Sequence, residues 1–374
     1  MKFADVLGQD TTKQQLIKMV QSNRLSHALL FHGKEGIGKK ALALAFAQYI
    51  VCENKQNNDA CGECSACKKA QKLIHPDIHF VFPVIKDSSK KAISDHYITE
   101  WREELLNQPY FSYQHWNSVL GEGKKASAIY VDESSEMIKK LNFKPFESEY
   151  KVMLIWLPEK MNPQTANKLL KTLEEPSEKT VLILIAENTD FMLSTILSRV
   201  QQIKIAPISD EIIKTYLKEH FTASEDILQF ATNYGKGNLI ESINALQQSE
   251  DNERYFEWFV QFMRLSYGNN MLELLPVIDQ IIGHEKNEIK NFLSYSIRYL
   301  RDNFMLNKEQ HGMVFLVEKE QAFAERFSQF INDANIDLMY RSLNQTIEDI
   351  NRNANIKIQM QVLAINMVRA FSMS

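Results

Sequence analysis

The chain has 374 residues, and a single core rarely grows beyond about 250 residues, so the length predicts two or three domains. With 44% hydrophobic and 24% charged residues, the composition is globular and excludes a fibrous or wholly disordered chain. Lys and Arg number 43 against 47 Asp and Glu, and the net charge of −4 excludes the global basic field of a protein that binds nucleic acid alone.

The N-terminal residues MKFADVLGQD lack the charged-then-apolar pattern of a secretory signal. No apolar run approaches the roughly 18 residues of a membrane span. We therefore expect a cytoplasmic protein without a membrane partner. All four cysteines lie between positions 52 and 67, and in a reducing compartment such clustering predicts metal ligation rather than disulfide bonds.

Short apolar runs bounded by polar residues predict buried strands, because parallel strands are covered on both faces and read as continuous hydrophobic stretches. These runs are residues 27–32 (HALLFH), 78–85 (IHFVFPVI), 152–157 (VMLIWL), 181–186 (VLILIA) and 200–206. Helical patterns such as residues 39–52 and 163–173 lie between them. The alternation predicts an α/β domain with a parallel sheet and helices on both of its faces.

The polar stretch at residues 86–125 interrupts this pattern, and we interpret it as an insertion or long excursion with a helix at 94–107. The rear of the chain is predicted to be helical, since only one of nine prolines, Pro276, follows Pro207. Within it, the aromatic-rich segment from Tyr255 to Phe262 predicts a helix buried against others rather than a ligand site.

A glycine-rich run, GKEGIGKK, lies between a predicted strand and a predicted helix. Gly33, Gly36, Gly38 and Lys39 match the GxxxxGK(S/T) loop, whose backbone N–H groups hold phosphates. The last position normally carries a hydroxyl that ligates Mg²⁺, whereas this chain has Lys40. ATP hydrolysis is therefore not expected, and binding of ATP or ADP stays open beside the alternative of a turn without a ligand.

An active site would also need an Asp–Glu pair at the end of another buried strand. Asp132 and Glu133 are the right residue types, but their apolar run is short, and they are predicted to be first-turn acids of a helix. The better buried strand ends in Trp156 and Leu157, where the acids belong. The sequence therefore predicts that a normal metal–nucleotide centre cannot assemble.

The cysteines form two consecutive C-x2-C steps, with Cys61, Cys64 and Cys67, and Cys52 adds a fourth thiol. Four thiolates close a tetrahedral shell and leave no open position, which predicts a structural zinc site. An iron–sulfur cluster is an alternative with a different usual spacing. His75 is a conceivable substitute ligand, although four thiols make it unnecessary.

Several segments together resemble the clamp-loader branch of the AAA+ family. They are Phe3–Gln9 (FADVLGQ), His27–Phe31 (HALLF), the glycine-rich run, the four cysteines with His75-Pro76-Asp77, Leu169–Pro176 (LLKTLEEP) and Ile196–Arg199 (ILSR). Within that branch, the chain is most similar to the delta-prime subunits of bacterial DNA polymerase III. The similarity covers about residues 1–250 by motif and the remainder by helical length only.

The resemblance implies an α/β AAA+ domain at residues 1–206 with a zinc module at 52–67, a helical lid at 207–249 and an all-α collar at 250–374 that joins a ring of subunits. It also implies a structural member without ATPase activity, in agreement with Lys40. The implied partners are the motor ATPase and clamp-opening subunits, and, through the complex, a sliding clamp and primed DNA.

The resemblance further implies that Arg199, with Ser198, supplies an arginine finger to ATP on the adjacent motor subunit. Val200 replaces the cysteine usual in that motif, and Ile240 stands where motor subunits place a lid arginine. A permanently charged planar guanidinium suits a phosphate whose charge grows in the transition state. Without the resemblance, the residue itself fits an ordinary surface ion pair.

Two other functions compete with this interpretation. One is an active AAA+ motor subunit in which Lys39 binds ATP and Asp132 with Glu133 forms the acid pair. The other is a zinc-dependent nucleic-acid-binding module that acts alone, against which the acidic charge balance speaks.

Overall fold

The computed structural model describes the chain except for residues 57, 87–90, 122–125, 311–313, 315 and 374. It forms two compact units: unit 1 comprises Met1–Glu219 and Gly235–Ser242, and unit 2 comprises His220–Tyr234 and Ile243–Ser374. The three-domain division at 206/207 and 249/250 stays a prediction. One helix, α11 (Leu239–Tyr267), runs without a break through position 249/250.

Unit 1 is built around a five-stranded parallel sheet, as the buried runs predict. The strands are β1 (Ala28–His32), β2 (Ile78–Val81), β3 (Lys151–Trp156), β4 (Thr180–Ala186) and β5 (Gln201–Lys204), in the spatial order β2-β3-β4-β1-β5. Strand β1 is therefore interior, between β4 and β5. The five predicted strands are confirmed, with ends that differ by at most four residues.

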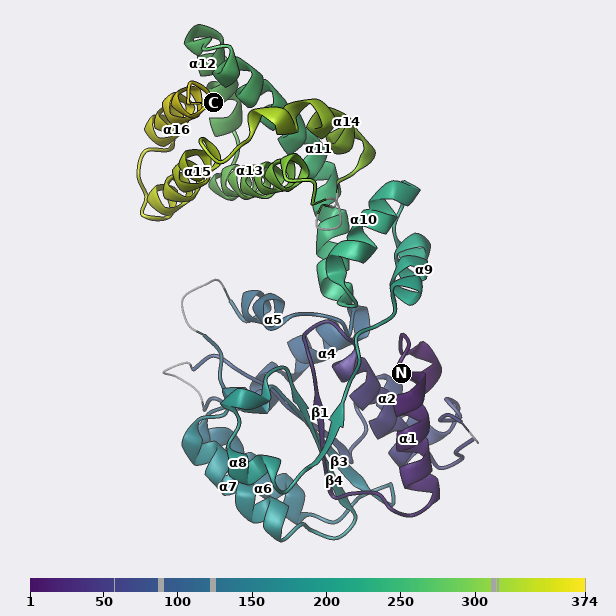
Figure 1. Cartoon of the computed structure of the whole chain (residues 1–374). Helices are drawn as coiled ribbons and strands as arrows, with labels where there is room; N and C mark the ends of the chain where they lie inside the picture. Colours follow the sequence, from purple (N-terminus) through teal and green to yellow (C-terminus); the bar gives the residue numbers. More distant parts are fainter. Residues whose placement is uncertain (57, 87–90, 122–125, 311–313, 315, 374) are drawn as a thin grey trace. The chain divides into compact units, whose positions relative to one another are not determined.

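Helices cover both faces of the sheet (Figure 1), and alternate side chains of each strand point to opposite faces and pack against them. The side chains of Ala28 and Leu30 in β1 pack in one cluster with residues of α6, α7 and α8, whereas Phe31 meets Phe46 of α2 on the other face. The helices of unit 1 are α1 (Asp10–Gln21), α2 (Lys39–Val51), α3 (Ser65–Gln71), α4 (Ile98–Asn107), α5 (Tyr113–Val119), α6 (Val131–Asn142), α7 (Pro163–Glu174), α8 (Ser194–Leu197) and α9 (Asp210–His220).

The excursion between β2 and β3 contains the predicted helix, as a short 3₁₀ turn at Ser94–Tyr97 followed by α4. Its parts at residues 87–90 and 122–125 lie outside the described residues. The excursion is held by aromatic packing: Trp101 stacks on Phe82 with ring centroids 4.2 Å apart, and Trp116 meets both rings edge-on. It is therefore part of the core of unit 1.

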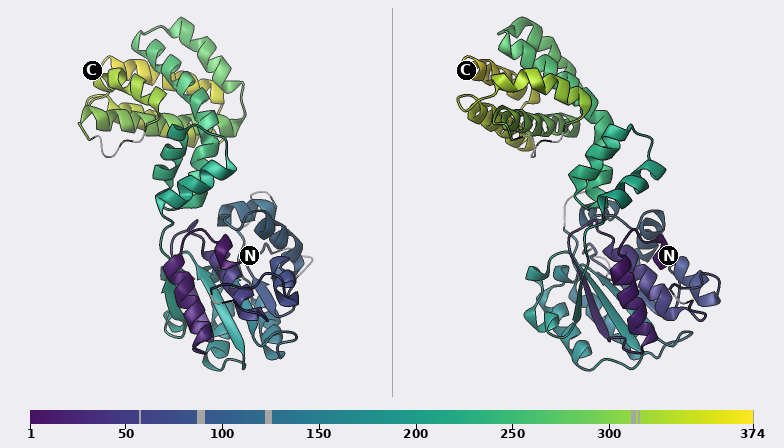
Figure 2. Two further views of the ribbon diagram at one scale, coloured as in Figure 1. Left: turned by 90° about the vertical axis from the view of Figure 1, so that its right-hand side faces the viewer. Right: turned by 45° about the vertical axis from the view of Figure 1, so that its right-hand side comes forward.

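Unit 2 contains only helices among its described residues, in agreement with the predicted helical rear (Figure 2). They are α10 (Glu225–Gly235), most of α11, α12 (Met271–Ile282), α13 (Lys286–Asn307), α14 (Glu318–Phe327), α15 (Ile336–Asn351) and α16 (Ile356–Phe371). Tyr255, Trp258, Phe259 and Phe262 of α11 are at most 2% exposed and belong to one large core. The predicted burial of this aromatic segment is confirmed.

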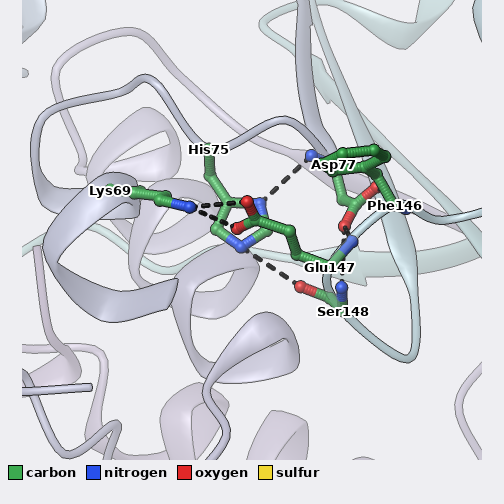
Figure 3. A network of polar contacts seen from close by, with 6 residues as sticks. All are labelled: Lys69, His75, Asp77, Phe146, Glu147 and Ser148. Carbon is green, nitrogen blue, oxygen red and sulfur yellow. Dashed lines mark hydrogen bonds and ion pairs between the residues drawn. The ribbon is translucent and has the colours of Figure 1, made fainter. Parts of the chain in front are cut away.

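The segment His75-Pro76-Asp77 connects the cysteine-rich region to β2, and Figure 3 shows its polar contacts. The Asp77 carboxylate accepts backbone N–H bonds from Phe146, Glu147 and Ser148 at 2.6–2.8 Å. His75 accepts the backbone N–H of Asp77 at Nδ1, and its Nε2 lies 3.1 Å from Ser148 Oγ. This network holds the loop before β3 against the start of β2.

One ion pair extends the network toward the cysteine-rich region. Lys69 of α3 lies 2.5 Å from the Glu147 carboxylate, in the same loop that Asp77 binds. Burial alone would raise the pKa of Asp77, but the three backbone donors outweigh it, and the pKa lies below its ordinary value. Asp77 therefore holds the loop as a carboxylate.

We expect Asp77→Ala to destabilise unit 1 by about 1.5–3 kcal/mol, because hydrogen bonds to a charged acceptor are lost. Since the folded-state pKa lies below the unfolded one, the contribution of Asp77 is complete above the unfolded pKa of about 4 and disappears as pH falls through the folded value. Urea unfolding at pH 7 and below pH 4 measures both effects, and hydrogen exchange of amides 146–148 locates them.

The control is Asp95→Ala, which removes an exposed carboxylate that pairs with Lys140. Surface pairs of this kind contribute about 0–1 kcal/mol. Equal destabilisation by the two substitutions, or unchanged exchange at amides 146–148, would contradict the role of Asp77.

Candidate functional site: a filled phosphate loop

The glycine-rich run lies at the carboxyl end of β1, where α/β proteins bind their ligands. Gly36 and Gly38 have positive φ angles of 73° and 91°, so the loop has the left-handed turns that a phosphate loop needs. Gly38 is the N-cap of α2, which begins at Lys39. The backbone framework of a phosphate-binding helix start is therefore present.

The lysine that would reach a phosphate folds back onto its own loop. Lys39 Nζ donates to the Gly33 carbonyl at 2.7 Å and to the carbonyl of Lys34. The residue is 5% exposed, and burial lowers the pKa of its ammonium to about 8. These two carbonyls accept the Lys39 N–H groups that would otherwise donate to a nucleotide phosphate.

Lys40, at the magnesium position, is enclosed by aromatic rings. Its Nζ lies 3.0 Å from the ring centroid of Phe111 and 4.3 Å from that of Trp156, and it donates to the Phe111 carbonyl at 2.6 Å. Burial lowers the pKa of Lys40 well below its ordinary value. The two rings and the carbonyl contact the Lys40 amino group from several sides and hold the side chain where it is.

Little space remains in front of the loop. The cavity there measures about 20 Å³, and its lining includes the loop together with Tyr110, Phe111, Trp156 and Ile240. Ligand pockets are usually about 300–1,000 Å³, and one water molecule needs at least about 10–15 Å³. The chain's own side chains therefore leave little free volume in front of the loop.

The segment before α11 closes the loop from a second direction. The Asn238 side chain lies against Gly36, where a Cβ atom would be only 1.6 Å from its Oδ1 atom. The N–H of Leu239 donates to the Gly36 carbonyl at 3.1 Å, and Asn238 Oδ1 accepts the N–H groups of Ile240 and Glu241 as an N-cap. Only glycine fits at position 36, and the contact is made by protein alone.

Two carboxylates lie near the loop without forming an acid pair for a metal. Glu159 accepts the backbone N–H groups of Glu187 and Asn188 at 2.7 and 3.1 Å, and so bridges the ends of β3 and β4. Burial, together with the neighbouring Glu35 carboxylate, raises the pKa of Glu187 to about 7. In this position Glu159 satisfies backbone donors.

Asp132 and Glu133, the two candidates for an acid pair, are first-turn acids of a helix, as the sequence predicts. In α6 they accept the backbone N–H groups of Ala92 and Ser94. Neither lines the cavity at the phosphate loop. Trp156 ends β3, with its ring centroid 5.1 Å from that of Trp101.

The four cysteines converge on one point. The sulfur atoms of Cys52 and Cys61 are 3.6 Å apart, those of Cys61 and Cys67 are 3.8 Å apart, and all four, including Cys64, lie within 4.8 Å of one another. Thiolates at about 2.3 Å from a tetrahedral zinc ion would be about 3.8 Å apart. The set therefore fits a closed four-thiolate metal site.

Backbone groups already point at these sulfur atoms. The N–H groups of Cys61, Cys64 and Cys67 donate to the preceding cysteine of the set, each at 3.4 Å. Such bonds lower the pKa of the Cys61 thiol to about 6, with the N–H of Cys64 as the largest cause. Donors of this kind stabilise thiolates and orient metal ligands. His75 is engaged with Asp77 and Ser148 instead.

Arg199 follows α8 on the surface of unit 1. Its Nη2 lies 2.8 Å from Glu174 of α7, and its Nη1 donates to the Thr195 carbonyl at 3.0 Å and to Ser198 Oγ at 3.3 Å. The side chain is 37% exposed. An exposed pair of this kind contributes at most about 1 kcal/mol, so another anion can displace Glu174.

Three residues that lie at or near the phosphate loop were not predicted from the sequence. Tyr110 and Phe111 come from the excursion, and Glu159 follows the strand that lacks its acids. The Pro-Tyr-Phe triplet in an otherwise polar stretch was a usable signal of burial. Nothing in its spacing indicated contact with Lys40.

No helix among the described residues combines the length and the apolar character that a bilayer crossing requires.

The profile of the family described as "DNA polymerase III, delta subunit" matches residues 8–209. A DNA polymerase III subunit delta' of Escherichia coli is 27% identical over 225 residues, which is 60% of this chain and 56% of that protein. That of Bacillus subtilis is 28% identical over 204 residues, 54% of this chain and 49% of that protein.

A DNA polymerase III subunit gamma of Buchnera aphidicola is 26% identical over 252 residues, 66% of this chain and 58% of that protein. This chain spans between 30% and 65% of the length of such curated relatives. A gamma subunit-related protein of Thermotoga maritima, solved by crystallography, shares 14% identity with a TM-score of 0.42 over 96% of this chain and 99% of that one.

The family profile covers more than half of the chain, from the segment before the phosphate loop to the end of β5. The parallel sheet, the loop and the cysteine cluster agree with it. The chain therefore belongs to the clamp-loader family of AAA+ proteins described as DNA polymerase III, delta subunit.

Proposed function

We propose that this chain is a delta-prime-like subunit of the bacterial DNA polymerase III clamp loader that does not hydrolyse ATP. The observation that carries the proposal is the filled phosphate loop, with Lys40 held by Phe111 and Trp156 where a magnesium ion would bind. Phosphoryl transfer depends on a bound nucleotide with a positioned metal ion, and a cavity of about 20 Å³ is too small for a nucleotide. The subunit would act mechanically within a ring, through its residues 250–374 as a collar.

The motor alternative needs Lys39 on a phosphate and Asp132 with Glu133 at the metal. Lys39 instead donates to two loop carbonyls, and Glu133 accepts a backbone N–H of the excursion. These contacts favour the non-hydrolysing function. The autonomous nucleic-acid module is disfavoured by the net charge of −4.

We further propose that Arg199 reaches ATP on a neighbouring motor subunit. Its weak surface pair with Glu174 positions the guanidinium, and a phosphate of the neighbouring ATP could replace Glu174 as its partner. The partners in this proposal are the motor and clamp-opening subunits, with a sliding clamp and primed DNA engaged through the complex, in the cytoplasm.

The metal of the cysteine site is proposed to be zinc with a structural role. It would link the end of α2, through Cys52, to the start of α3. Zinc in a closed four-sulfur shell supplies cohesion and no open coordination position for chemistry. The same α2 begins at the phosphate loop, so the metal would steady the helix that carries Lys39 and Lys40.

Purified protein should contain one zinc per chain, and Cys64→Ser should lose it and lower the melting temperature by roughly 5–10 °C, because metal-binding energy contributes to folding. Elemental analysis and thermal unfolding measure the two effects. The control is Ser65→Ala, beside the site but outside the sulfur set, which should keep both values. Iron with visible absorbance, or no metal, would contradict the assignment.

Isolated protein should show neither heat of binding with millimolar Mg-ATP nor phosphate release, because its own side chains fill the site. Lys39→Met, which keeps the apolar stem, should leave the ATP turnover of a reconstituted loader within about twofold. Calorimetry and a phosphate assay test this. Brisk release by the isolated chain that Lys39→Met or Glu133→Gln abolishes would instead support the motor function.

Arg199→Ala should lower ATP turnover at the neighbouring site of the assembled loader by about 10³, the lower range for an arginine finger. Its melting temperature and incorporation into the ring should stay unchanged, because the lost ion pair is exposed. Glu174→Ala is the matched control, since it breaks the same pair but retains the guanidinium. Turnover that is equal in both variants and the wild type rules the finger out.

A further inference from the structure

A groove in unit 2 runs between α11 and α14 and has a volume of about 620 Å³. From α11 it is lined at helical spacing by Phe256, Val260, Met263, Arg264 and Tyr267. From α14 and the turn after it, the lining residues are Lys319, Ala322, Phe323, Arg326, Phe327 and Phe330. Two helix faces thus form its walls over a length of about 16 Å.

The floor of the groove is apolar and rests on the core. Phe256 meets Phe323 edge-to-face with ring centroids 5.9 Å apart, and Phe323 stacks on Phe327 with ring centroids 5.0 Å apart. Phe256 and Phe323 are partly buried and pack against the core of unit 2, whereas Tyr267 is 54% exposed. The floor is thereby held in place before any partner binds, which lowers the entropic cost of binding.

The rim of the groove is basic. Its charged lining residues are Arg264, Lys319 and Arg326, with no carboxylate among the described residues that line it. Lys319 pairs with Glu253, while neither Arg264 nor Arg326 has an ion-pair partner in the described parts of the chain. Two arginines therefore face solvent beside an apolar floor.

The opposite side of α14 has the reverse charge. The cavity there is lined by Asp226, Glu318 and Glu325, and no Lys or Arg contributes to it from the residues that the structure describes. Helix α14 thus separates an acidic surface from a basic one. This separation gives the groove a specific charge preference that a uniformly mixed surface would lack.

We propose that this groove binds an acidic amphipathic helix of another protein. Apolar side chains at i, i+3 or i+4 and i+7 would enter the floor, and flanking carboxylates would meet Arg264 and Arg326. Because the described residues of unit 2 include no strand, its surface has no described sheet edge for strand addition. The inference does not depend on the ATPase status of the subunit.

Single-stranded nucleic acid is the other polyanion that aromatic and basic residues attract, but it needs free ring faces for base stacking. One face of Phe323 stacks on Phe327, and the Arg264 guanidinium lies over its ring at 5.8 Å. The ring centroids of Tyr267 and Phe330 are 4.8 Å apart. These rings are engaged with one another, so the groove favours a peptide.

The experiment uses the full chain to select from a display library of random peptides of about 16 residues, a length that covers the groove as a helix. Selected peptides are synthesised, and their affinities are measured by fluorescence anisotropy at low and high salt. We expect acidic sequences with helical apolar spacing, weaker binding at high salt, and an about tenfold or greater loss of affinity for R264E/R326E.

The matched control is R341E/R352E, which reverses two exposed arginines, one in α15 and one directly after it, that do not line the groove. This variant should bind as the wild type does. Ala322→Trp should block the groove sterically without changing charge, and R264Q/R326Q serves if the charge reversal fails to fold. Peptides that are not acidic, equal binding by the groove and control variants, or groove-dependent binding of a labelled oligo-dT instead of peptides would each overturn the proposal.

Discussion

The buried side chain of Lys40 determines what the phosphate loop can do. Lys40 stands where phosphate loops carry the hydroxyl that ligates Mg²⁺, and two aromatic rings with one carbonyl hold its amino group in place. The arrangement is stable because the buried amino group has partners on several sides. The loop thus keeps the backbone turns of an anion site while its interior is occupied by lysine and aromatic side chains. The chain thus keeps the fold of its family although Lys40 stands where the phosphate-loop motif has Ser or Thr.

The same helix connects the other features of unit 1. Helix α2 begins at the loop with Lys39 and ends next to Cys52, and all thirteen of its residues are buried. This helix packs on the sheet. At one end of the sheet, Glu159 bridges β3 and β4 through backbone N–H groups. The network of Asp77 then joins the cysteine-rich region to the loop before β3. The phosphate loop, the cysteine cluster and the sheet are therefore connected by direct contacts.

Much of this architecture could be predicted from local patterns. The strands were readable because continuous apolar runs need burial on both faces, and Asp132 and Glu133 were recognisable as first-turn acids from the helical spacing after them. The contact of Lys40 with Phe111 could not be predicted, because 71 residues separate them and the excursion between is mostly polar. Glu159 was missed for a similar reason, since its partners are backbone N–H groups, which leave no trace in residue type.

The contact between Gly36 and Asn238 has a physiological consequence. The groups that hold the loop at this point, the amide side chain of Asn238 and the N–H of Leu239, both belong to the polypeptide itself. If the loop binds no nucleotide, as we propose, this contact within unit 1 would not respond to the cellular ratio of ATP to ADP, in starvation as in rapid growth.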